Sequence, residues 1–172
     1  RGPVAEVTIR RPERLNALNE GLVDDLNAYF GGLADRPEVR VVILRGAGRG
    51  FCAGLDIQED RSSDETPVLR TLRTQTRIGN IYRKMRVCPQ PIIALGHGAA
   101  CGGGLSLLLA SDVRYATPDF RANAAYIRIG LGGCDMASSY FLPRLVGASL
   151  AAEMILTGRF IDAERALRAG LV

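Results

Sequence analysis

The chain has 172 residues, of which 47% are hydrophobic, and this length suits one domain with a substantial core. Its formal charge of +4 is small and comes from arginines scattered along the chain, which does not favour a nucleic-acid-binding protein. The most apolar stretch, residues 91–110, contains a histidine, a serine and five glycines and is a poor membrane span. We therefore expect neither nucleic acid nor membrane as a partner.

Strand and helix signals alternate through the first third of the chain. Residues 4–9 predict a strand, and Asn19 can cap a helix whose apolar residues recur at helical spacing as far as Leu33. Residues 39–44 are almost continuously apolar, which predicts a strand covered on both faces. Residues 58–67 are polar and charged and predict a mobile loop.

A helix is predicted from residue 68 to about residue 86. Its arginines share one face, which we interpret as a solvated face: Arg70, Arg73 and Arg77. Further strands are expected at 92–95 and 112–116, and helices at 136–145, 150–156 and 163–167, the last capped by Asp162. This order favours an α/β architecture with buried sheets and right-handed crossovers, and no linker divides the chain.

Cysteine usage gives no sign of disulfides or a metal site. None of the cysteines forms a C-x-x-C pair, and the chain has one histidine. We expect no bound metal and free thiols in a reducing, cytoplasmic compartment at four positions: Cys52, Cys88, Cys101 and Cys134.

Two glycine turns carry the strongest functional signal. Residues 51–56 and 96–104 each follow an apolar, strand-like run, and the second opens directly into a helix-like segment. Glycine lets a ligand approach bare backbone N–H groups. Two such groups converging on one carbonyl oxygen would stabilise an enolate or a tetrahedral oxyanion.

Both turns resemble the signature turns of the crotonase superfamily, also called the enoyl-CoA hydratase/isomerase family. Similar landmarks follow in the family's order: residues 11–18, 51–57, 91–104, 142–147 and 156–172. The resemblance implies a stack of ββα units that forms two roughly perpendicular sheets wrapped by helices. It also implies a homotrimer or a dimer of trimers. Because the family continues with further helices, we expect residues 1–172 to be a single core domain truncated at both ends, with the C-terminal helices missing.

The resemblance also assigns site residues. The oxyanion donors are the backbone N–H groups of Leu55 and Gly103. CoA enters as part of an acyl-CoA thioester substrate, and no other cofactor is implied. The residues assigned to binding this ester are Arg14, Leu15, Ala17, Ala53, Asp56, Ile57, Gly102 and Tyr126.

The two catalytic glutamates of the family's hydratases are absent. Ser106 stands where the first is expected, and residues 124–126, Ala-Ala-Tyr, stand where the second is expected. A serine hydroxyl is no general base near neutral pH unaided, so ordinary two-glutamate hydration is not expected.

Asp135 is the remaining candidate acid/base. It stands eight residues before Pro143, a spacing similar to that of the catalytic aspartate of dienoyl-CoA isomerases, aryl-CoA dehalogenases and some β-hydroxyacyl-CoA hydrolases. A pocket lined by Leu131, Met136 and Phe141 would raise its pKa by desolvation. The alternative is a capping role, because Asp135 directly precedes the helix predicted from Met136.

Other groups have structural interpretations. His97 lies between two glycines at a strand end, and no histidine is adjacent in sequence to activate Cys101 or Cys134. The pattern Gly96-x-Gly98-x-x-Cys101 is one residue from a dinucleotide fingerprint, but its third glycine is replaced and it lies in mid-chain.

The sequence thus predicts an acyl-CoA processing enzyme of the hydratase/isomerase type, with dienoyl isomerisation as the reaction that best suits a lone aspartate. Two alternatives stay open. One is an acyl-CoA thioester hydrolase, and the other is a catalytically lapsed family member that binds acyl-CoA or serves as a scaffold.

Overall fold

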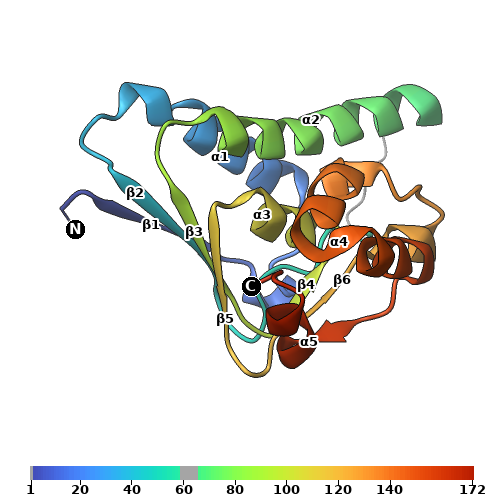
Figure 1. Ribbon diagram of the computed structural model, residues 1–172. Coiled ribbons are helices and arrows are strands. Elements are labelled where there is room, and N and C mark those ends of the chain that lie inside the picture. The colour runs from blue at the N-terminus through green and yellow to red at the C-terminus, as the bar shows by residue number, and fades with distance from the viewer. Residues whose placement is uncertain (1, 59–65) are drawn as a thin grey trace.

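The structure is a computed structural model that describes residues 2–58 and 66–172. Its larger sheet has four parallel strands in the order β1 (Val4–Ile9), β2 (Val41–Gly46), β3 (Ile92–Gly96) and β5 (Val113–Ala116). These strands fan out on one side of the molecule (Figure 1). The predicted strands are confirmed, although β2 begins at Val41 rather than at residue 39.

The prediction that residues 39–44 form a strand covered on both faces is wrong for the face of β2 that points away from the core. Val42 and Leu44 are fully buried, whereas Val41 and Ile43 are half-buried and Arg45 is exposed. The strand is therefore buried on one face only. Its apolar run reflects partial shielding of the outer face rather than a second covering layer.

The second sheet is made of very short strands that the sequence analysis did not predict. β4 (Ala99–Cys101) pairs in parallel with β6 (Arg121–Asn123), which pairs antiparallel with β7 (Ile161–Asp162). Single bridges from Cys52 to Ala100 and from Leu18 to Leu55 extend it. Each of β2, β3 and β5 is thus followed by a pairing segment in the second sheet and then by a helix, which confirms the predicted ββα pattern.

Within residues 2–58 and 66–172, five α-helices surround and fill the space between the sheets (Figure 1). They are α1 (Glu20–Gly31), α2 (Pro67–Val87), α3 (Gly103–Ala110), α4 (Ser138–Thr157) and α5 (Ala163–Arg168). The side chains of Asn19 and Asp162 cap α1 and α5 as predicted, by accepting from the N–H groups of Leu22 and Arg165. Short 3-10 turns occupy Pro12–Arg14, Leu33–Asp35, Ala125–Ile129 and Asp135–Ala137.

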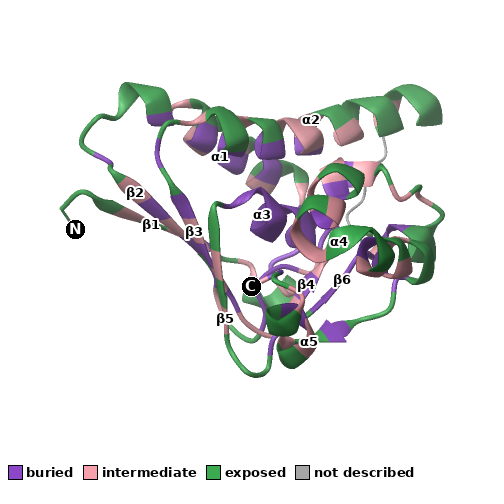
Figure 2. Ribbon diagram, viewed as in Figure 1, coloured by how far each residue is buried: buried purple, intermediate pink, exposed green. Residues whose placement is uncertain are grey.

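α3 lies at the centre of the fold. Every one of its residues is buried, in contrast to the amphipathic α2 that lies over it (Figure 2). A helix that is apolar on all sides belongs in a core, and here it packs against α2, α4 and β4. Its first residue, Gly103, is therefore held in place from several directions.

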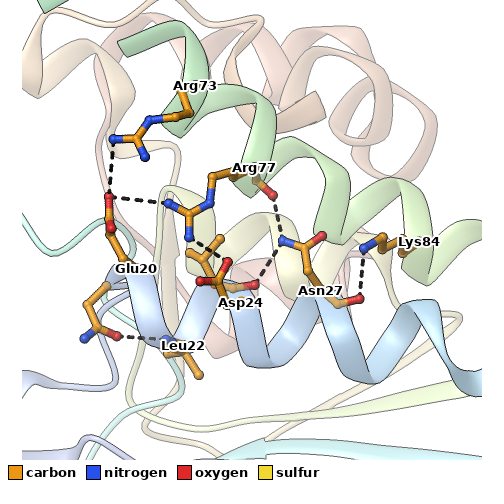
Figure 3. Close-up of polar contacts among 9 residues, drawn as sticks. Glu20, Leu22, Asp24, Asn27, Arg73, Arg77 and Lys84 are labelled. Atoms are coloured by element: carbon orange, nitrogen blue, oxygen red, sulfur yellow. Dashed lines mark hydrogen bonds and ion pairs between the residues drawn. The ribbon is translucent and has the colours of Figure 1, made fainter. Parts of the chain in front are cut away.

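The arginine face of α2 is not the free solvated face that was predicted. Arg77 pairs with Asp24 at 2.6 Å and with Glu20 at 3.4 Å, both on α1, and Arg73 also approaches Glu20 (Figure 3). Asn27 of α1 donates to the carbonyl of Arg77 at 2.9 Å. These polar contacts join α1 to α2 and hold α2 in a fixed orientation relative to α1.

Two further predictions change in detail. The helices expected at 136–145 and 150–156 are merged in α4, which begins at Ser138 and is interrupted at Gly147, where φ is +77°. Of the loop predicted at 58–67, residues 59–65 lie outside the described residues. Across residues 2–58 and 66–172, no helix is long and apolar enough to cross a membrane.

Candidate active site

The two glycine turns meet in space. A methyl group on Gly54 would lie 2.7 Å from the carbonyl oxygen of Cys101 and 3.4 Å from the amide nitrogen of Gly103. One on Gly104 would overlap the carbonyl oxygen of Cys52. The backbones of the two turns therefore touch directly, which only glycine at these positions allows.

Backbone pairing leaves the N–H of Leu55 unused. Leu18 donates to the carbonyl of Gly54 at 2.7 Å and accepts from the N–H of Asp56 at 3.0 Å. Groups alternate along a strand, so the N–H of Leu55 points to the opposite side. The N–H of Gly103 lies in the first turn of α3, where no intrahelical acceptor exists. Neither amide has a hydrogen-bond partner in the part of the chain that the structure describes.

Leu55 lies between two cavities. The cavity on the side of the first turn, here the first-turn cavity, has a volume of about 340 Å³ and is lined by Glu13, Arg14, Leu15, Ala17, Arg49, Ala53, Leu55, Asp56, Ile57 and Gln58. It gathers six of the residues assigned to ester binding. The second, here the α2 cavity, has a volume of about 290 Å³ and is lined by Leu55, Arg70, Thr71, Thr74, Gln75, Ile129 and Leu131.

Gly102 and Tyr126 lie elsewhere. Gly102 is buried and donates its N–H to the carbonyl of Asn123 at 3.0 Å. Tyr126 is 4% exposed, and its ring lies 3.6 Å from where a methyl group on Gly102 would be. The structure thus brings these two residues together next to Gly103, but neither lines the two cavities described above.

The first turn is anchored by residues that the sequence analysis did not single out. Asn16, fully buried, donates to the carbonyls of Ala47 at 2.7 Å and Gly50 at 2.8 Å and accepts from the N–H of Arg11 at 2.8 Å. Its φ of +58° suits asparagine, which tolerates the left-handed region. Asn16 lies within the 11–18 landmark, but its partners at residues 47 and 50 follow only from the fold.

An ion pair closes the same turn. The guanidinium of Arg11 donates to the carbonyl of Ala17 at 2.6 Å and to the Asp56 carboxylate at 3.0 Å. Burial favours a raised pKa for Asp56, but the hydrogen bonds from Arg11 and from the N–H of Gln58 outweigh it and hold the pKa below its usual value. Asp56 is therefore a charged, structural part of the first-turn cavity.

Asp135 lies beside the α2 cavity. It is half-buried, and its Oδ2 accepts from Nε2 of Gln75, a lining residue, at 3.4 Å. Its Oδ1 accepts from the N–H of Met136 at 3.0 Å. Burial raises the pKa of the Asp135 carboxyl despite these two bonds, and this is the direction that makes a better base.

The capping interpretation of Asp135 does not hold. Met136 and Ala137 both adopt left-handed conformations, with φ of +48° and +60°, and α4 begins only at Ser138. The N-cap residue of α4 is Ala137, whose side chain makes no capping hydrogen bond. Two consecutive left-handed residues without glycine are strained, and such strain is concentrated at functional sites.

Three buried hydroxyl groups occupy the region where hydratase glutamates were expected. Ser106 lies 2.7 Å from the Tyr126 hydroxyl and 3.2 Å from that of Ser138, and the Tyr126 and Ser138 hydroxyls are 2.9 Å apart. We call these three residues the hydroxyl triangle. Burial raises the pKa of Tyr126, so the triangle is uncharged. It holds α3 against the start of α4.

The remaining candidates have structural environments. Nε2 of His97 lies 3.0 Å from the carbonyl oxygen of Gly48. All four cysteines are free thiols, and burial raises the pKa of Cys52 to about 12 and that of Cys101 to about 11. Within residues 2–58 and 66–172, no cluster of three or more His, Cys, Asp or Glu side chains is arranged to hold a metal ion.

Comparison with known proteins identifies the family. The model of the family described as enoyl-CoA hydratase/isomerase matches residues 1–172. The chain belongs to the enoyl-CoA hydratase/isomerase family. A relative from Mycobacterium leprae, named probable enoyl-CoA hydratase echA12, is 40% identical over 176 residues, which cover 100% of this chain and 60% of the relative.

Solved structures of this family share the fold. A probable enoyl-CoA hydratase/isomerase from Mycobacterium abscessus is 40% identical with a TM-score of 0.91, and the match covers 100% of this chain and 65% of that one. A monofunctional enoyl-CoA isomerase from M. smegmatis is 41% identical with a TM-score of 0.81, covering 100% and 71%. The chain therefore spans about 60% of the length of the first curated relative, and the predicted crotonase fold is confirmed.

Proposed function

We propose that this enoyl-CoA hydratase/isomerase family member processes an acyl-CoA thioester through an enolate. The N–H groups of Leu55 and Gly103 hold the thioester oxygen, and Asp135 moves the proton. The observation that carries this proposal is the contact of the two glycine turns. The N–H groups of Leu55 and Gly103 have no other partner among the described residues, and Leu55 lines both cavities.

The two cavities suit the two ends of such a substrate. The first-turn cavity carries Arg14 and Arg49 on its wall, which favours an anionic CoA moiety. The α2 cavity combines apolar side chains, Leu55, Ile129 and Leu131, with polar ones from α2, and it would take the acyl group. Leu55, which lines both, lies where the thioester would join them.

The proton step follows from these positions. Asp135 takes a proton from the carbon next to the thioester carbonyl, and the C–H electron pair passes into the enolate, whose oxygen accepts from the two N–H groups. Return of the proton to another carbon of the conjugated system shifts the double bonds. One carboxylate suffices for this isomerisation, because it serves as base and then as acid.

Two-glutamate hydration has no support in the structure. The Ser106 hydroxyl is committed to the hydroxyl triangle, and no glutamate of the described residues lines the α2 cavity. Thioester hydrolysis stays an alternative, because the same two N–H groups would stabilise a tetrahedral oxyanion. A lapsed, acyl-CoA-binding protein is the other alternative, favoured by the loss of the glutamate positions.

A panel assay tests the proposal. The full chain and its Asp135→Asn variant are given 2-enoyl-, 3-enoyl-, dienoyl- and β-hydroxyacyl-CoA esters, and ultraviolet absorbance and free thiol are followed. We expect turnover of a dienoyl or enoyl ester without thiol release, reduced at least about 10²-fold in Asp135→Asn. Thiol release would identify a hydrolase. Ester binding without any turnover would support the lapsed protein instead.

A further inference from the structure

Gln75 connects the α2 cavity to Asp135. It projects from the middle of α2, lines the cavity, and its Nε2 donates to Oδ2 of Asp135 across 60 positions of sequence. The only other hydrogen bond that the described residues give to this carboxylate comes from the N–H of Met136, its direct neighbour. Gln75 is thus the one side chain that fixes the carboxylate from another element.

The second amide atom of Gln75, Oε1, is buried and lacks a hydrogen-bond partner among the described residues, as do the amide oxygens of Asn27, Gln90 and Asn123. A buried acceptor without a donor costs free energy, so its retention calls for an explanation. The atom lies on the same amide group that contacts Asp135, and a half-turn of that amide exchanges the positions of Nε2 and Oε1.

We propose that Gln75 is the positioning residue of Asp135 and that its amide pairs with this side chain both as carboxylate and as carboxylic acid. With the carboxylate, Nε2 donates, as the structure shows. Once Asp135 has taken a proton, its O–H needs an acceptor, and Oε1 supplies one after the amide turns. No hydrophobic or charged side chain could serve both states.

The other ionisable groups around Asp135 are limited. Tyr82 from α2 and Tyr126 from the Ala125–Ile129 turn lie within electrostatic range, and burial raises the pKa of both, which keeps them neutral. α3 contributes no ionisable side chain. Arg70 of α2 lines the same cavity, and in α4 the Arg144 guanidinium lies over the ring of Tyr140.

The test compares Gln75→Leu and Gln75→Glu with Thr71→Val in the full chain. Thr71 lines the same cavity one helical turn away, but its hydroxyl donates to the carbonyl of Pro67 and not to Asp135. Two readouts are taken for each variant. One is the pKa of Asp135 from carbon-13 NMR of its carboxyl carbon, and the other is the acidic limb of the kcat/KM pH profile. The second readout rests on the proposed function.

We expect Gln75→Leu to raise the pKa of Asp135 by about 0.5–1 pH unit in both readouts, because the charged carboxylate loses a stronger hydrogen bond than the carboxylic acid does. Gln75→Glu should raise it further, because a second carboxylate then faces the first. Thr71→Val should leave the NMR pKa of Asp135 unchanged, because the Thr71 hydroxyl bonds to the carbonyl of Pro67 instead.

An unchanged NMR pKa in Gln75→Leu would overturn the inference while leaving the proposed function intact. A shifted NMR pKa with an unmoved activity limb would show instead that Asp135 is not the base. That second result would remove Asp135 from the proposed function, whereas the shifted NMR pKa would still support the action of Gln75 on Asp135. Equal shifts in Thr71→Val would also overturn the inference, because the effect would then belong to the cavity wall in general.

Discussion

At the scale of single residues, burial of Asp135 lowers stability at neutral pH and also makes its carboxylate a better base. Burial raises the pKa of its carboxyl above the ordinary value of 3.8, so the folded protein binds a proton at Asp135 more readily than the unfolded chain does. The contribution of Asp135 to the free energy of unfolding is therefore fully present below pH 3.8, and it is lost as the pH rises through the folded-state pKa.

Replacing Asp135 with Asn removes the charge and keeps the shape. We expect Asp135→Asn to be more stable than the wild type at pH 7, with an advantage that shrinks as the pH falls toward 4. Urea unfolding at several pH values measures this. A stability advantage of the same size at pH 7 and at pH 4 would contradict the burial argument.

The hydroxyl triangle gives a second prediction at this scale. Tyr126→Phe leaves the Ser106 and Ser138 hydroxyls 3.2 Å apart but takes one partner from each, in a fully buried site. We expect a loss of about 1–2 kcal/mol of unfolding free energy. Tyr115→Phe, at a tyrosine that is 62% exposed, is the control and should change stability by less than about 0.5 kcal/mol. Equal losses of unfolding free energy in Tyr126→Phe and Tyr115→Phe would mean that the hydroxyl triangle does not stabilise the fold.

At the scale of elements, the contact between the second-sheet segment at Cys52 and the start of α3 depends on glycine. Gly104→Ala would press a methyl group onto the carbonyl oxygen of Cys52 and push α3 away from the first turn. We expect a loss of about 2–3 kcal/mol in unfolding free energy, together with loss of turnover, because the N–H of Gly103 moves with α3.

Gly79 is the matched control on α2. A methyl group there meets nothing within 4 Å, and α2 is regular at that point. Gly79→Ala should therefore stabilise the protein by about 0.5–1 kcal/mol and leave turnover unchanged. If both variants lost stability to the same extent, close packing of the two turns would not be the cause.

The same elements show how far sequence patterns reach. α1 and α5 were predicted because Asn19 and Asp162 are good caps before helical spacing. β4, β6 and β7 have only two or three residues, too few for any periodicity, and were missed. The break at Gly147 falls in the gap between the helices expected at 136–145 and 150–156. The start of α4 at Ser138 was missed, because Met136 and Ala137 adopt left-handed conformations that no local pattern records.

At the scale of the whole molecule, the winding of ββα units brings distant motifs together. Leu55 and Gly103 could be selected from the sequence, because each lies in a glycine turn with a recognisable pattern. Gln75 and Asn16 could not be given their roles in advance, since each depends on partners about 30 to 60 positions away. Those partners are known only once the fold is formed.

The chain spans about 60% of the length of its first curated relative, yet all the elements of the proposed site lie within it. The first-turn cavity, the α2 cavity and Asp135 are built from α2 and the turns between residues 11 and 137. The central claim is therefore that these elements form an enolate from an acyl-CoA thioester.

Exchange of α-protons tests that claim most directly, because it needs enolate formation but no complete reaction. The full chain is incubated with a saturated acyl-CoA ester in D₂O, and proton NMR follows the hydrogens next to the thioester, with Asp135→Asn alongside. We expect exchange that is catalysed by the wild type and lost in Asp135→Asn. Absence of exchange with ester bound to the wild type, or equal exchange in the variant, would contradict the account.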